Sequence, residues 1–161
     1  MQPTPPTDEH RWLQRLVGEW TSETTCSTGP GQPPSINRGR DTIRALGDYW
    51  VVIDSEGEML DGAPFSMRVQ IGYDPELGRF RGTWIGSMMP MLWVYDGELD
   101  ASRTILTLKA RGPSFAGDGS VTDYEDIIEL NPSGERRFRS RVLMPDGTWN
   151  EFMHADYRRV G

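Results

Sequence analysis

Cysteine and histidine are scarce in this sequence, and their scarcity limits its chemistry. Among 161 residues, Cys26 is the one cysteine, and His10 and His154 are the two histidines. A single cysteine cannot form a disulfide within the chain, so nothing indicates an oxidising compartment. Two histidines give a classical zinc site or a serine–histidine triad little to draw on. We therefore expect neither a metal nor another cofactor.

Long apolar runs and familiar catalytic motifs are missing as well. No apolar stretch approaches the roughly 18–20 residues that span a bilayer. Residues 1–7 lack the basic and apolar regions of a signal peptide. The sequence contains no Gly-x-Ser-x-Gly, Walker loop, His-Glu-x-x-His or Cys-x-x-Cys. These absences favour a cytoplasmic location, and they leave enzymatic activity without a supporting motif.

Negative charge exceeds positive charge. The chain has 17 Lys and Arg residues against 24 Asp and Glu residues, which gives a formal net charge of -7. An acidic surface repels both phosphate backbones and anionic membranes. We therefore expect no nucleic-acid partner and no membrane partner. The apolar content of 36% and the charged content of 25% are typical of a globular chain.

The beginning of the chain has the pattern of a short helix. Residues 1–7 are expected to form a disordered arm, because their prolines deny it regular structure. Thr7 is a suitable N-cap and Gly18 a suitable stop. Apolar residues recur between them at helical spacing: Trp12, Leu13, Leu16 and Val17. A helix of about ten residues is unstable alone, so it must pack on the rest of the protein. His10 is expected to lie exposed on this helix.

After Gly18 the apolar period changes to two, which is typical of strands. The clearest segment is residues 65–73, where apolar residues alternate with polar residues and glycine. Turns rich in Gly, Pro, Asp and Asn separate the segments. The predicted strands cover residues 19–28, 36–46, 50–59, 65–73, 79–86, 92–96, 105–110, 121–130, 136–143 and 149–159.

This pattern predicts an all-β fold: a closed antiparallel up-and-down barrel of about ten strands with a short N-terminal helix. The turns are short and consecutive, which favours hairpin connections, and closure removes exposed sheet edges. Residues 8–161 should form this single domain. A barrel of this size can hold one small ligand.

Several short motifs resemble a known family. The segment from His10 to Trp20 is similar to the opening of calycin-type barrels, a helix followed by Gly-x-Trp. A bacterial family known as domain of unknown function 1579 shares further motifs: Leu46-Gly47, Gly72-Tyr73-Asp74, Trp84, and Glu151-x-Met153 followed by Tyr157-Arg158-Arg159. The resemblance implies a calycin-like barrel, related in shape to lipocalins, fatty-acid-binding proteins and nitrobindins. It implies no established activity.

Nitrobindin-like barrels bind haem through a histidine near the C-terminus, and His154 has a roughly comparable place. Their Gly-rich continuation after Gly-x-Trp is replaced here by Thr-Ser-Glu-Thr-Thr. On the last predicted strand, alternation places His154 on the outward face. Glu151 falls on the more apolar face with Met153 and Tyr157, which is predicted to point inward. A buried carboxylate needs a partner, either on a neighbouring strand or in a ligand.

Three functional hypotheses remain open. In the first, the barrel carries a small apolar or amphipathic ligand: Trp84, Met67 and Met153 form the wall, and Glu151 and Tyr157 orient the polar end. In the second, Glu151 is the general base of an enzyme. In the third, the Met and Trp side chains fill the core, and the protein is a non-catalytic interaction module or a homodimer.

Overall fold

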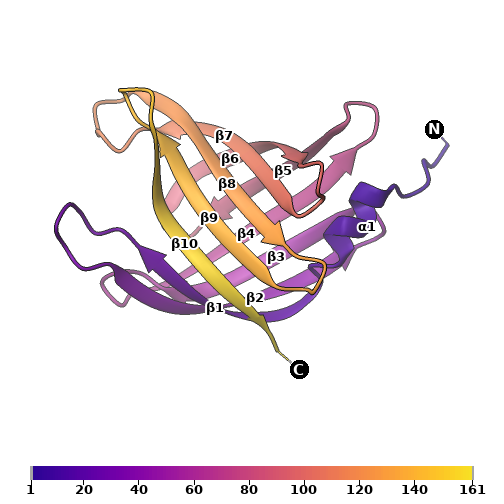
Figure 1. Cartoon of the computed structure of the whole chain (residues 1–161), viewed down its shortest axis with the longest axis horizontal. Helices are drawn as coiled ribbons and strands as arrows, with labels where there is room; N and C mark the ends of the chain where they lie inside the picture. The colour runs from indigo at the N-terminus through magenta and orange to yellow at the C-terminus, as the bar shows by residue number, and fades with distance from the viewer. Residues whose placement is uncertain (1, 161) are drawn as a thin grey trace.

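A ring of ten antiparallel strands forms the body of the protein in the computed structural model, which describes residues 2–160 (Figure 1). Each strand pairs with its neighbours in the sequence, and β10 closes the ring against β1. The predicted fold class is therefore confirmed. The strands are β1 (Gly18–Cys26), β2 (Ser35–Leu46), β3 (Trp50–Glu58), β4 (Pro64–Asp74), β5 (Arg79–Gly86), β6 (Met89–Leu99), β7 (Ile105–Pro113), β8 (Val121–Leu130), β9 (Arg136–Leu143) and β10 (Trp149–Arg159).

Up-and-down connectivity places alternate connections at the two ends of the barrel. The connections after β2, β4, β6 and β8 share one end with the helix α1 (Asp8–Gln14). The tightest of them turn on glycines with positive φ, such as Gly47 at 63° and Gly78 at 65°. The opposite end carries the connections after β1, β3, β5, β7 and β9, and no helix covers it within residues 2–160.

Helix α1 closes its end of the barrel as an apolar plug. Trp12, Leu13 and Leu16 are at most 4% exposed and join the core cluster with inward residues of the strands. The helix has seven residues rather than about ten. The backbone bonds of residues 15–17 reach back three positions instead of four, so the last predicted turn is tighter than an α-helix. Among residues 2–160, no helix is long and apolar enough to cross a membrane.

Strands β6 and β7 pair along only part of their lengths. Their ladder has four residue pairs, from Asp96–Lys109 to Leu99–Leu106, all on the side of α1. Beyond this ladder, the Trp93 ring lies over Gly112, where a Cβ atom would meet it at 2.1 Å. β6 runs from Met89 to Leu99, so it begins before residue 92 and ends after residue 96, the predicted bounds. The wall of the barrel thus has a partly unpaired seam toward the open end.

Candidate ligand site inside the barrel

The inner wall of the open half is built from large apolar side chains that solvent still reaches. Met67, Trp84, Trp93 and Met153 lie on the inward row of their strands, yet each is half-buried. Near α1 the inward side chains are almost completely buried. The exposure of the inward side chains therefore decreases from the open end toward the plug.

Two tryptophans of this wall are held by methionine sulfurs. The indole Nε1 of Trp84 donates to Sδ of Met67 at 3.2 Å, and Nε1 of Trp93 donates to Sδ of Met89 at 3.1 Å. A thioether is a weak acceptor, so each indole N–H is satisfied without placing a strongly polar group in the wall. Trp84 and Met67 were both predicted to line the interior, and the structure brings them together. Met153 lies on β10, opposite Cys26 of β1.

An aromatic cluster stands near the mouth of the barrel. Tyr124 meets Trp93 edge-to-face at 5.1 Å and Phe115 at 5.8 Å, and Phe115 meets Phe152 at 5.1 Å. Phe115 belongs to the connection after β7 and is 67% exposed. This cluster was not predicted from the sequence, because a β-bulge between Glu151 and Met153 changes the facing of β10 there.

A buried ion pair crosses the interior between β2 and β9. Nη2 of Arg136 lies 2.8 Å from Oδ2 of Asp41, and the two side chains are 3% and 4% exposed. Ser55 on β3 donates its hydroxyl to the other oxygen of Asp41 at 2.7 Å. Burial in a low dielectric makes such a pair costly unless it is well bonded, and these contacts bond the carboxylate on both oxygens. Neither Arg136 nor Asp41 was predicted from the sequence to have an interior role.

Tyr157 covers one face of this ion pair. The guanidinium carbon of Arg136 lies 3.7 Å from the centre of the Tyr157 ring and 5.2 Å from that of Trp20, both cation–π distances. Burial raises the pKa of Tyr157 to about 12; the charge of Arg136 lowers it, and the charges of Asp41 and Asp126 raise it. At neutral pH Tyr157 is therefore a neutral phenol beside a cation.

A second polar cluster lies inside the barrel on β6, β8 and β9. Tyr95 donates its hydroxyl to Asp126, and Ser140 donates to the other oxygen of that carboxyl at 2.6 Å. Burial raises the pKa of the Asp126 carboxyl, against the lowering effect of these two hydrogen bonds. Burial also holds the pKa of Tyr95 well above its ordinary value, with a further contribution from Asp126. The interior thus combines apolar side chains with two buried polar groups of residues, the Asp41–Arg136 pair beside Trp20 and the Asp126 cluster.

Glu151 does not point inward, and this prediction is wrong. Its side chain is 43% exposed and lies 3.9 Å from both Arg139 and His154, residues of the outer surface. The bulge that follows Glu151 breaks the strict alternation on which the prediction depended. His154 faces outward as predicted, with 48% of its side chain exposed. Residues 2–160 contain no cluster of three His, Cys, Asp or Glu side chains that could hold a metal ion.

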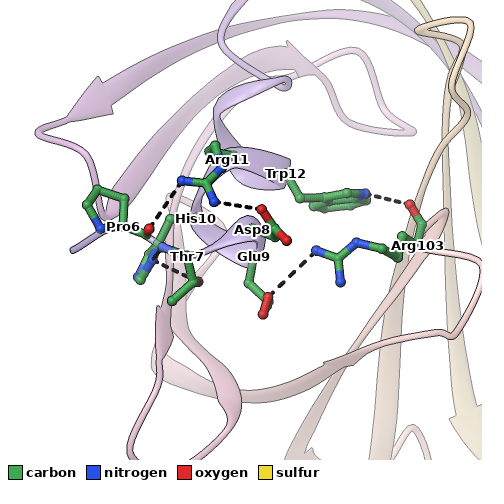
Figure 2. A network of polar contacts seen from close by, with 8 residues as sticks. All are labelled: Pro6, Thr7, Asp8, Glu9, His10, Arg11, Trp12 and Arg103. Atoms are coloured by element: carbon green, nitrogen blue, oxygen red, sulfur yellow. Dashed lines mark hydrogen bonds and ion pairs between the residues drawn. The ribbon is translucent and has the colours of Figure 1, made fainter. Parts of the chain in front are cut away.

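His10 is buried rather than exposed, and it anchors the plug. Its exposed fraction is 1%. Nδ1 accepts the backbone N–H of Thr7 at 2.8 Å, so the proton is assigned to Nε2, which donates to the carbonyl of Tyr73 at 2.9 Å. Figure 2 shows the contacts around this turn, including the bond from Trp12 Nε1 to the carbonyl of Arg103 at 2.8 Å. This role was not predicted from the sequence, because the N3 position of a capping box is typically Glu or Gln rather than His.

These features define a class of protein: a closed ten-stranded barrel, plugged by a helix at one end, with a partly polar interior that solvent reaches from the other. A family model described as "Protein of unknown function (DUF1579)" matches residues 5–159, so the chain belongs to that family. No curated protein sequence matches the chain.

Two solved structures share the fold at low sequence identity. Rv2717c from M. tuberculosis superposes with a TM-score of 0.65 at 14% identity, over 98% of this chain and 100% of that one. The barrel EF1p2_mFAP2b bound to DFHBI superposes with a TM-score of 0.51 at 12% identity, over 94% of this chain and 99% of that one. At these identities the likeness shows the fold alone.

Proposed function

We propose that the protein binds a small apolar or amphipathic ligand inside its barrel, and that the ligand enters through the end opposite α1. One observation carries the proposal: inward tryptophan and methionine side chains, Trp84 and Met67 among them, stay half-buried in a barrel whose other end is sealed. Apolar walls with a few convergent polar groups are typical of small-molecule sites.

Different residues of the wall contact different parts of the ligand. Trp84, Met67 and Met153 contact the apolar part of the ligand, and the adaptable thioethers fit it closely. Tyr157 lies deeper, beside Arg136, and faces the polar end. Glu151 takes no part, because its carboxylate is on the outer surface; the same placement removes it as a general base inside the barrel. The EF1p2_mFAP2b barrel, which is bound to DFHBI, supports the proposal by analogy of fold.

The first test asks whether the purified protein carries a ligand and whether it binds a neutral probe. Native mass spectra of freshly purified protein, compared with denatured spectra, should show an added mass. Nile red, an uncharged dye, should bind with increased fluorescence.

Two matched variants locate the probe. Trp84→Ala should weaken Nile red binding about tenfold, or roughly 1.4 kcal/mol. Leu92→Ala removes an apolar side chain that is 60% exposed on the outside of β6, and it should leave binding unchanged. Circular dichroism checks that both variants fold. Equal losses in the two variants, or no loss in Trp84→Ala, would place the dye outside the barrel and contradict the proposal.

A further inference from the structure

Arg136 has more hydrogen-bonding capacity than its neighbours use. Its Nη2 is bonded to Asp41, but the buried Nε and Nη1 have no hydrogen-bond partner among residues 2–160. A guanidinium has five N–H donors, and a buried donor without a partner costs about 1–3 kcal/mol. No other side chain in the described chain has two such atoms. The Arg136 guanidinium that carries these two atoms lies inside the barrel, beside the wall residue Tyr157.

The positive charge of Arg136 is already balanced by a negative charge, although its N–H donors are not all hydrogen-bonded. Asp41 lies 2.8 Å from it, and both side chains are 4% exposed or less. Asp126 is also near this cluster, because its charge raises the pKa of Tyr157. A carboxylate arriving here would add a negative charge that nothing in the cluster offsets, and an unbalanced buried charge is expensive. A neutral oxygen acceptor would satisfy an N–H and leave the charge balance unchanged.

We infer that Arg136 is the polar subsite of the barrel, and that it takes the uncharged oxygen of an amphipathic ligand, such as the carbonyl of a ketone or ester. The inference rests on the proposed function and names the ligand class of that site. Tyr157 lies over the guanidinium, so the ligand oxygen approaches the edge of the group rather than its covered face. The apolar tail then extends along Trp84 and Met67 toward the open end.

Three nine-carbon probes test the ligand class on the wild-type protein by displacement of Nile red: 2-nonanone, nonanoate and nonane. The ketone should bind about tenfold more tightly than the other two, because a hydrogen bond to a charged group has about this strength. Tightest binding by nonanoate would overturn the inference in favour of a carboxylate site. Equal binding of ketone and alkane would overturn it while leaving the proposed function standing. Failure of all three probes and of Nile red would remove both.

A second readout follows Arg136 itself. In ¹H–¹⁵N spectra, the Nε–H or Nη resonances of Arg136 should shift on addition of 2-nonanone but not on addition of nonane. The double variant Asp41→Asn/Arg136→Met removes both charges together, and it should lose the preference for the ketone over nonane. If that variant does not fold, the wild-type spectra decide: unchanged Arg136 resonances at saturating ketone contradict the inference.

Discussion

Asp41 and Arg136 meet across the interior at 2.8 Å, although β1 and β10 lie between their strands in the sheet. The pair therefore ties together residues 95 positions apart in the chain. The arginine side chain passes over the inner face of two strands to reach the carboxylate, and Tyr157 and Trp20 accompany it. The stability of this contact and the chemistry proposed for it can be tested separately.

The energetic effects of removing the two partners of this pair should not be additive. Asp41→Asn or Arg136→Met alone leaves a buried polar group without its partner, and it should lower the free energy of unfolding by about 3–5 kcal/mol. The double variant should lose clearly less than the sum of the two. Urea denaturation measures all three. Arg40→Met, which breaks a half-exposed pair with Glu19, should stay within about 1 kcal/mol as a control. Additive losses would contradict the buried pairing.

Tyr157 should make the folded state sensitive to high pH. Its pKa is about 12 in the folded protein and about 10 in an unfolded chain. The folded state thus holds the phenolic proton more tightly, and the stability that follows is complete below pH 10 and is lost as the pH rises toward 12. Free energies of unfolding measured from pH 9 to 12 should fall more steeply in the wild type than in Tyr157→Phe. Tyr95 is present in both proteins, so its own shift cancels. Parallel stability curves for the two proteins would show that the pKa of Tyr157 is not raised in the folded state.

His10 should stabilise the plug more than its exposed neighbour Arg11. His10→Ala removes the acceptor of the Thr7 N–H and the donor to the Tyr73 carbonyl, and it leaves a cavity. We expect a loss of about 2–3 kcal/mol in thermal or urea unfolding. Arg11→Ala removes a largely exposed ion pair with Asp8 and should cost no more than about 1 kcal/mol. Similar losses in the two variants would argue against a structural role for the buried imidazole.

Glu151→Gln should change neither stability nor ligand binding. The carboxylate is on the outer surface, where its 3.9 Å contacts with Arg139 and His154 are weak. The free energy of unfolding should move by less than about 1 kcal/mol, and the Nile red affinity should equal that of the wild type. A tenfold loss of affinity in this variant would place Glu151 inside the barrel after all.

The fold could be predicted from the sequence because period-two alternation and turn residues carry most of its information. Residues 65–73 alternate strictly, and they form most of β4, with Ile71 fully buried. The prediction failed where a single residue interrupted the alternation. The bulge after Glu151 reverses the facing of the residues before Met153, and no local composition marks it.

The site could be predicted in part. Trp84 and Met67 follow from alternation within one hairpin, so a local pattern was enough to place them together. Arg136 and Asp41 are distant in sequence, and their contact depends on ring closure and on the reach of one long side chain. The burial of His10 depends on the docking of α1 against β4, and helical spacing alone does not specify that docking. Side-chain pairing across the barrel is a tertiary property, and the periodicity of one strand does not contain it.

The short ladder between β6 and β7 has a consequence for association between molecules. Past Asp96 and Lys109 no ladder joins the facing edges of the two strands, in a ring that otherwise has no edge. Free strand edges recruit strands from other chains. Pro90 lies in the unpaired half of β6 and Pro113 ends β7, and proline offers no N–H to an incoming strand. Replacing either proline would add a backbone N–H to this seam, and we expect the variants to associate with other chains more readily than the wild type.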